Sequence, residues 1–267
     1  MENDINLAIG DRPELKWVDK LKCGVDHNYQ REVKPHVVAK ILRKFSWSKF
    51  GALSLAEQPD GTFSVIDGQH RLEAAKLHPR IADIPAVVNR LDGTQQEANV
   101  FLGINTDRTA VTTVERFWAG IEAGDQAMIR IRDVLKRADC EIVASAGPAP
   151  RSNMTNSVTA VQRAIDRYGE KAVIAACRTL KTAWHDDKAA LNGTMITALS
   201  RIFRGNAEMS IERMQAQLNK KSRAQLVADA HAMRKIVGGA AETALSKTLV
   251  EIYNRQLQNN LISIGLA

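Results

Sequence analysis

The pattern of apolar residues changes once along this sequence, near Ala110, and the change limits the folds that the chain can adopt. Before it, short strand-like runs alternate with short helical stripes, a pattern typical of a small mixed α/β module. After it, the apolar stripes have helical spacing, and we find no convincing strand. We therefore predict an α+β fold, with a small mixed α/β module over residues 1–110 and an all-α module over residues 111–267.

Local signals predict several elements. Apolar residues alternate with lysines in the first run, as on a half-buried strand: Leu15, Trp17, Leu21 and Cys23. Pro35 suits the first turn of a helix. The segment 58–61, Gln-Pro-Asp-Gly, separates two strand-like runs and predicts a hairpin, because proline presets φ and glycine supplies a positive φ. In the second module, Thr112 and Glu115 have the spacing of a helix capping box, and residues 147–150 predict a loop.

Charge is distributed unevenly between the two modules. The sequence carries 37 Lys+Arg and 30 Asp+Glu, a formal net charge of +7. The first 110 residues hold 15 of each sign, so the whole basic excess falls in the second module. A basic module beside a neutral one is typical of the part of a protein that meets nucleic acid. An ordinary basic surface can also carry this excess, so charge alone leaves DNA contact open.

Several classes of protein are excluded by what the sequence lacks. Its three cysteines, Cys23, Cys140 and Cys177, are scattered and odd in number, which argues against a disulfide framework and a zinc site. No apolar run approaches the roughly 18 residues of a membrane span, and the first residues are acidic and polar, unlike a signal peptide. We therefore expect a cytoplasmic protein without membrane contact and without a resident metal site. No Walker loop, Rossmann fingerprint or serine nucleophile elbow is present.

The segment Asp67-Gly68-Gln69-His70-Arg71 carries the densest chemistry, because it links a strand-like run to a helical one. Gly68 lets the backbone approach a ligand closely, and the N–H groups at the start of a helix form an anion site. Arg71 can bind a phosphate in a bidentate manner, and His70 can move a proton. Asp67 can accept a hydroxyl proton or hold a hydrated cation. We predict phosphate-binding roles for Gly68, Gln69, His70 and Arg71, and catalytic roles for Asp67 and His70.

A simpler interpretation stays open for the same residues. The segment can be only a turn that begins a helix, with His70 and Arg71 paired to nearby carboxylates. Elsewhere, His27 and His36 lack metal-ligand spacing, and the acidic patch after His185 is better explained as a solvated helix end.

Residues 67–71 also form the DGQHR motif of the ParB/sulfiredoxin-like superfamily, and the chain resembles the ParB-like N-terminal domains of phage and plasmid proteins. Tyr29-Gln30-Arg31 resembles the YQR element of related proteins, and Phe101-Leu102-Gly103-Ile104-Asn105 resembles their F-x-x-I-N segment. The resemblance covers about residues 15–110. The helical remainder is similar only in layout.

The resemblance implies a fold that binds a nucleoside triphosphate of unidentified base, with or without Mg²⁺, on the Gly68–Arg71 turn. It also implies that Arg31 reaches the same anion. Related proteins of this fold clamp DNA, transfer phosphoryl groups, phosphorylate free serine or act as nucleases. Gln69 stands where sulfiredoxin has its reactive cysteine, which excludes reductase chemistry.

One helical segment of the second module is a candidate for DNA contact. Thr159, Gln162 and Arg163 share a side of the segment 156–165 if its aliphatic residues face the core, and such side chains can read base edges or phosphates. An ordinary bundle helix with a polar face explains the pattern equally well.

These observations favour a ParB-like, nucleotide-dependent DNA-binding protein, with NTP hydrolase or nuclease activity left open. One alternative is a phosphotransferase acting on a small molecule, and another is a non-catalytic regulator that binds DNA or protein. The expected partners are a nucleotide and DNA, with a homodimer left open.

Overall fold

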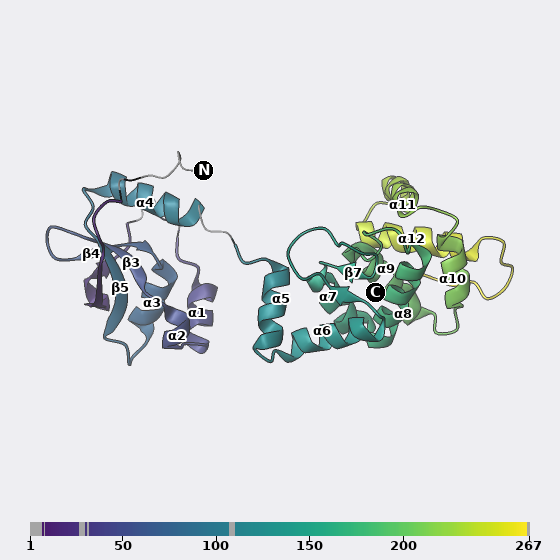
Figure 1. The fold of residues 1–267 in the computed structure, drawn as a ribbon, viewed down its shortest axis with the longest axis horizontal. Helices are drawn as coiled ribbons and strands as arrows, with labels where there is room; N and C mark the ends of the chain where they lie inside the picture. The colour runs from purple at the N-terminus through teal and green to yellow at the C-terminus, as the bar shows by residue number, and fades with distance from the viewer. Residues whose placement is uncertain (1–6, 8, 27–29, 31, 107–109, 266–267) are drawn as a thin grey trace. The chain divides into compact units, whose positions relative to one another are not determined.

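The structure is a computed structural model, and it describes residues 7, 9–26, 30, 32–106 and 110–265 (Figure 1). The chain divides into two compact units, residues 1–109 and residues 110–267. The first unit mixes strands and helices, and the second is almost entirely helical, so the fold is α+β as predicted.

The first unit is built on a five-stranded sheet with the strand order β1-β5-β3-β4-β2. Its strands are β1 (Glu14–Asp19), β2 (Cys23–Gly24), β3 (Leu53–Glu57), β4 (Phe63–Asp67) and β5 (Asp83–Asn89). Strands β3 and β4 form the predicted antiparallel hairpin, and Gly61 has a φ of +79° in its turn. Strand β3 also pairs in parallel with β5, and the short β2 extends the sheet beside β4.

Helices α1, α2 and α3 lie together on one side of this sheet (Figure 1). The helices of the unit are α1 (Pro35–Arg43), α2 (Trp47–Phe50), α3 (Gln69–Leu77) and α4 (Thr94–Thr106). Pro35 occupies the first turn of α1, which confirms that expectation. Leu53, Val65 and Leu72 are fully buried between sheet and helices, so the core fixes the direction in which β4 enters α3.

The predicted buried face of the first strand is wrong. Leu15, Trp17 and Leu21 are 77%, 61% and 75% exposed, whereas Val18 is buried. Strand β1 is an edge strand that ends at Asp19, and its inward face carries Lys16 and Val18, with the Lys16 ammonium 5.4 Å from the Phe63 ring centroid. A shift of one residue exchanges the two faces of a strand, and a lysine stem can cover apolar surface, so alternation alone selected the wrong face.

The outward Trp17 belongs to an aromatic chain on the surface of the first unit. Its ring meets the Trp47 ring edge-on at a centroid distance of 5.3 Å. Trp47 in turn lies 5.1 Å from Phe45 and 5.6 Å from Phe50. Edge-on pairs of this kind are favourable arrangements for aromatic rings.

The second unit holds eight helices in its described residues: α5 (Thr113–Glu122), α6 (Gln126–Arg137), α7 (Val158–Tyr168), α8 (Glu170–Ala183), α9 (Gly193–Gly205), α10 (Ile211–Leu218), α11 (Arg223–Val237) and α12 (Ala241–Asn254). Helix α9 packs against α7, α8 and α12 at the centre of the core. The predicted capping box is confirmed, because Thr112 and Glu115 bond each other's backbone. None of the helices in the described ranges is both long and apolar enough to cross a membrane.

The expectation that the second unit contains no strand is corrected by one small feature. Strands β6 (Glu141–Ile142) and β7 (Met154–Thr155) pair in parallel on either side of the predicted loop. Two-residue strands are too short to show alternation, so the sequence pattern could not reveal them.

All three cysteines are free and buried. Burial raises the pKa of the Cys23 and Cys140 thiols to about 11, and it raises that of the fully buried Cys177 further. Because the thiolate is the reactive form, a thiol with a pKa near 11 is only about 0.1% ionised at pH 8. We expect slow reaction with a thiol-specific chromogenic reagent under native conditions and rapid reaction of three thiols in denaturant. Fast reaction of the native protein would contradict this burial.

Candidate functional site

A cleft of about 700 Å³ opens where β4 ends and α3 begins. All five residues of the predicted motif line it: Asp67, Gly68, Gln69, His70 and Arg71. Other segments contribute further lining residues: Gln30, Lys49, Phe50, Phe101 and Asn105. The strand–turn–helix geometry therefore places the motif on the wall of a cavity large enough for a small ligand.

Gly68 forms the turn because its backbone conformation and its surroundings both exclude a side chain. Its φ is +108°, in the left-handed region that favours glycine. A Cβ atom there would lie 2.8 Å from Leu53 Cγ and 2.9 Å from Arg71 Nη2. Gly68 is also the N-cap of α3, so the cap residue itself has no side chain to accept from the first N–H groups of the helix. The first turn of α3 therefore offers N–H groups and a positive dipole end to an anion.

Arg71 braces this turn against the loop that precedes β3. Its Nη1 donates to the carbonyl oxygens of Phe50 (2.8 Å) and Ala52 (3.0 Å). Its Nη2 donates to Asp67 Oδ2 at 3.1 Å, and both side chains are about three-quarters buried. The geometry thus shows the carboxylate pairing that the simpler sequence interpretation expected for Arg71. Its contact with a phosphate stays a prediction.

His70 is held by the start of another helix. Its Nε2 accepts a hydrogen bond of 3.0 Å from the backbone N–H of Lys34, the N-cap residue of α1. An imidazole nitrogen that accepts a hydrogen bond carries no proton, so the proton of the neutral ring is on Nδ1. A proton-transfer role for His70 stays a prediction, and in this arrangement it would use Nδ1.

Gln69 presents a buried, unsatisfied hydrogen-bond acceptor in the cleft. The side chain is 8% exposed, and its Oε1 has no hydrogen-bond donor among the described residues. Leaving a buried acceptor unpaired costs about 1–3 kcal/mol, so a donor supplied by a ligand would be stabilising here. The phosphate-binding role predicted for Gln69 stays a prediction, and the unpaired Oε1 is an acceptor that the motif alone did not reveal.

Gln30 and the end of α4 form two further parts of the cleft wall. The Gln30 amide is buried and donates to the carbonyl oxygens of Val65 and Ile66 on β4, so Gln30 is attached to the strand that enters the motif, while Tyr29 lies outside the described residues. Phe101 and Asn105 lie at the end of α4, where the Asn105 amide donates to Phe101 O at 2.8 Å. Only the family resemblance had indicated the segments that carry these residues.

Lys49 and its neighbour Phe50 are lining residues that the sequence analysis did not identify. Lys49 lies on α2, its side chain is exposed, and no carboxylate in the described part of the chain pairs with its ammonium group. A single lysine between two aromatic residues carries no sequence signal. Arg31, which we predicted to reach the same anion as the Gly68–Arg71 turn, lies outside the described residues.

Helix α7 carries the predicted DNA-binding residues. Thr159 and Arg163 are exposed and Gln162 is half-buried. The aliphatic residues of the helix face the core as predicted: Val158, Val161 and Ile165. The side that Thr159 and Arg163 share is therefore open to solvent, while its contact with DNA stays a prediction.

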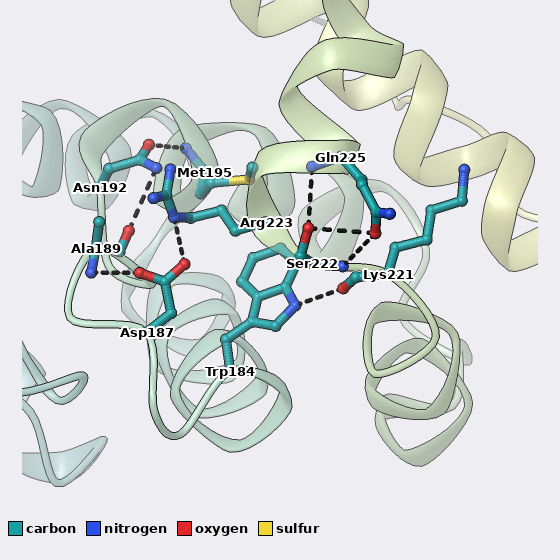
Figure 2. Close-up of polar contacts among 9 residues, drawn as sticks. All are labelled: Trp184, Asp187, Ala189, Asn192, Met195, Lys221, Ser222, Arg223 and Gln225. Carbon is teal, nitrogen blue, oxygen red and sulfur yellow. Dashed lines mark hydrogen bonds and ion pairs between the residues drawn. The ribbon is translucent and has the colours of Figure 1, made fainter.

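Asp187, in the acidic patch after His185, links its loop to the start of α11 (Figure 2). Asp187 Oδ2 accepts from Arg223 Nε at 2.7 Å, and Asp187 Oδ1 accepts from the Ala189 backbone at 2.8 Å. The Trp184 indole donates to Lys221 O at 3.0 Å, so the loop that follows α8 is attached at two points to the segment that begins α11. No cluster of metal-ligating side chains occurs within the ranges that the structure describes.

Comparisons with known proteins give one family and distant structural likenesses. Residues 25–256 match the model of a family described as "Family of unknown function (DUF6551)". No curated protein matches the chain. Two crystal structures of C-terminally truncated chromosome-partitioning ParB from Caulobacter crescentus are similar at low levels.

The first ParB structure, complexed with CTP-γ-S, has 14% identity and a TM-score of 0.34, and the match covers 89% of this chain and 99% of that one. The second, complexed to the centromeric parS site, has 11% identity and a TM-score of 0.29, with 77% and 100% covered. Similarity at this level carries no inference about function.

Proposed function

This chain belongs to the family of unknown function DUF6551, and we propose that it is a ParB-like, nucleotide-dependent DNA-binding protein of phage or plasmid type. In this proposal a nucleoside triphosphate binds in the cleft at the β4–α3 turn, and the helical unit contacts DNA. The DGQHR resemblance and the chemistry of the cleft support the first part. The basic excess after Ala110 supports the second.

The observation that carries the proposal is the unpaired buried oxygen of Gln69 beside an anion-binding helix end. A nucleotide supplies both matching groups, because its phosphates accept hydrogen bonds from the start of α3 and its base or sugar can donate to Gln69 Oε1. Lys49 adds a cation without an ion-pair partner among the described residues. Phosphates would thus meet N–H groups and a lysine, while Arg71 holds the turn in shape.

The phosphotransferase alternative is less well supported by the same geometry. Its general base would be Asp67, but this carboxylate already accepts from the Arg71 guanidinium at 3.1 Å. The second proton-transfer candidate, His70, uses Nε2 to hold the start of α1. Both groups are engaged in positioning the cleft, which favours ligand binding over turnover. We therefore propose nucleotide and DNA binding, and we do not propose NTP hydrolysis or DNA cleavage.

For the helical unit, we propose that α7 contacts DNA through Thr159, Gln162 and Arg163. The exposed guanidinium of Arg163 would bind a phosphate or a base edge, and the other two side chains would hydrogen-bond nearby. For an electrostatic interface of this kind, the logarithm of the affinity falls linearly with the logarithm of the salt concentration. Salt-sensitive binding of a DNA duplex to the full chain would favour this proposal over a small-molecule phosphotransferase.

We expect nucleoside triphosphates, tested singly with and without Mg²⁺, to raise the melting temperature of the full chain. Lys49→Met should weaken nucleotide affinity roughly 10–150-fold, because a charge-assisted contact contributes about 1.5–3 kcal/mol. Gln69→Met should remove much of the nucleotide-induced shift without lowering the melting temperature of the free protein, since it deletes a buried unpaired oxygen. Thermal-shift titration measures both effects.

Lys40→Met is the matched control, because Lys40 is an exposed lysine on α1 outside the cleft. It should bind nucleotide as the unaltered chain does. If no nucleotide shifts the melting temperature under any metal or DNA condition, the nucleotide part of the proposal is wrong. Salt-sensitive DNA binding without nucleotide binding would then support the non-catalytic regulator.

A further inference from the structure

A second cavity, of about 600 Å³, lies within the helical unit. Its walls come from the end of α7, the end of α9 and the segment that follows α12, with Arg167, Tyr168, Arg204, Ser263 and Gly265 among the lining residues. None of these residues belongs to the motif or to the predicted DNA-binding set. The cavity therefore needs its own explanation.

Arg201, one turn before Arg204 on α9, is a buried arginine that forms no ion pair with a carboxylate in the part of the chain that the structure describes. Its side chain is 9% exposed, and its Nη2 donates a hydrogen bond of 3.3 Å to Gly265 O on the cavity wall. Its Nε is shielded from solvent and has no acceptor among the described residues. Burying an unpaired guanidinium is costly, because the charge loses its hydration and gains no compensating anion.

Two further arginines, Arg167 and Arg204, line the cavity directly, whereas Arg201 lies behind its wall and reaches it through the bond to Gly265 O. The Arg167 guanidinium lies 5.6 Å from the Tyr168 ring centroid, and Arg204 lines the cavity from α9. We call Arg167, Arg201 and Arg204 the arginine cluster. In the described part of the chain, none of the three forms an ion pair with a carboxylate. The nearby Glu242 accepts from the Tyr168 hydroxyl at 3.0 Å, so this carboxylate is already engaged.

Specific contacts hold the segment after α12, which forms the third wall of the cavity. The Asn206 side chain donates to Ser263 O at 2.7 Å and accepts from Ser263 N at 3.0 Å. Gly205 and Gly265 meet so closely that a Cβ on Gly205 would lie 2.7 Å from Gly265 Cα. The segment after α12 is therefore positioned by specific contacts, and the cavity is a built feature of the unit.

We propose that the arginine cluster binds a phosphate group in this cavity. Guanidinium groups match the oxygens of a phosphate in fork-like hydrogen bonds, and a phosphate supplies the negative charge that the buried Arg201 lacks. The phosphate comes from a DNA backbone or from a free phosphate-bearing molecule. The DNA source rests on the proposed function, whereas the free source does not.

Inorganic phosphate is the probe for the site itself. We expect low-millimolar phosphate, compared with chloride at equal ionic strength, to raise the melting temperature of the full chain. Arg204→Gln should abolish this increase. Arg201→Met should abolish it too while leaving the free protein equally or more stable, because it removes an unpaired buried charge. Lys188→Gln, an exposed cation on the loop before α9, is the charge-matched control and should keep the increase.

A DNA-binding measurement identifies the source of the phosphate. Fluorescence anisotropy with a generic duplex should show about tenfold weaker binding by Arg204→Gln, with a salt slope smaller by about one, if the cluster contacts the DNA backbone. Unchanged DNA binding together with a lost phosphate effect supports the free molecule as the source.

The proposal is wrong if phosphate does not raise the melting temperature of the unaltered chain and Arg204→Gln binds DNA as the unaltered chain does. It is also wrong if phosphate raises the melting temperature of all variants equally. Equal destabilisation of Arg201→Met in phosphate and in chloride would likewise show that Arg201 only holds Gly265. If the unaltered chain binds no DNA, the DNA part of the proposed function fails, and the phosphate arm still decides the site.

Discussion

Replacing Gly68 by alanine is expected to lower the free energy of local unfolding of the β3–β4 hairpin by about 2–4 kcal/mol and to abolish nucleotide binding. The new Cβ would lie 2.8 Å from Leu53 Cγ and would require a left-handed φ of +108° from alanine. Leu53 is fully buried and cannot move aside without opening the core. Amide hydrogen exchange of β3 and β4 in the full chain measures this effect.

Gly61→Ala supplies the control for backbone strain alone. Gly61 has a φ of +79° in the hairpin turn, and a Cβ there would meet no atom within 4 Å. It should cost about 1–2 kcal/mol and leave nucleotide binding intact. Equal effects of the two substitutions would show that the contact of Gly68 with Leu53 contributes nothing.

Replacing Arg71 by alanine is expected to be the other large change, with a loss of about 3–4 kcal/mol in local stability of the first unit and loss of nucleotide binding. The substitution removes the donors to Phe50 O, Ala52 O and Asp67 Oδ2 at once. Arg71→Lys should recover little, because one ammonium group cannot reproduce the fork that joins two carbonyls and a carboxylate.

Asp67→Asn tests the contact of Arg71 with the carboxylate separately from its contacts with the two carbonyl oxygens. It removes the charge of the pair but leaves the bonds from Arg71 to Phe50 O and Ala52 O, so it should cost about 1 kcal/mol and keep most nucleotide affinity. Hydrogen exchange and nucleotide titration check both variants. If Arg71→Ala keeps its native exchange pattern but loses nucleotide, Arg71 contacts the ligand directly, as the sequence first indicated.

Local signals predicted the parts of the fold that depend on neighbouring residues. The hairpin at Gly61, the proline at the start of α1 and the capping box at Thr112 each involve contacts within a few residues. The strand–turn–helix around Gly68 is of the same kind. Such features are legible because the residues that cause them stand next to the backbone they shape.

The contacts that decide the roles of the site residues are distant in sequence, and for that reason they could not be predicted. Arg71 is bound by carbonyls about twenty residues earlier, and His70 by the backbone of Lys34. Carbonyl and N–H groups occur at every residue, so nothing in the sequence marks which of them a side chain will meet. The prediction of the buried face of β1 was wrong for a related reason, because packing against the neighbouring strand and helices decides which face is buried.

The aromatic chain from Trp17 to Phe50 gives the cleft an optical reporter. Phe50 lines the cleft and holds Arg71 through its carbonyl oxygen, and its ring lies 5.6 Å from that of Trp47. Any ligand that moves Phe50 therefore changes the environment of an indole on the surface of the same unit. Occupancy of the cleft can be followed through native tryptophan emission, without a label and while the chain remains intact.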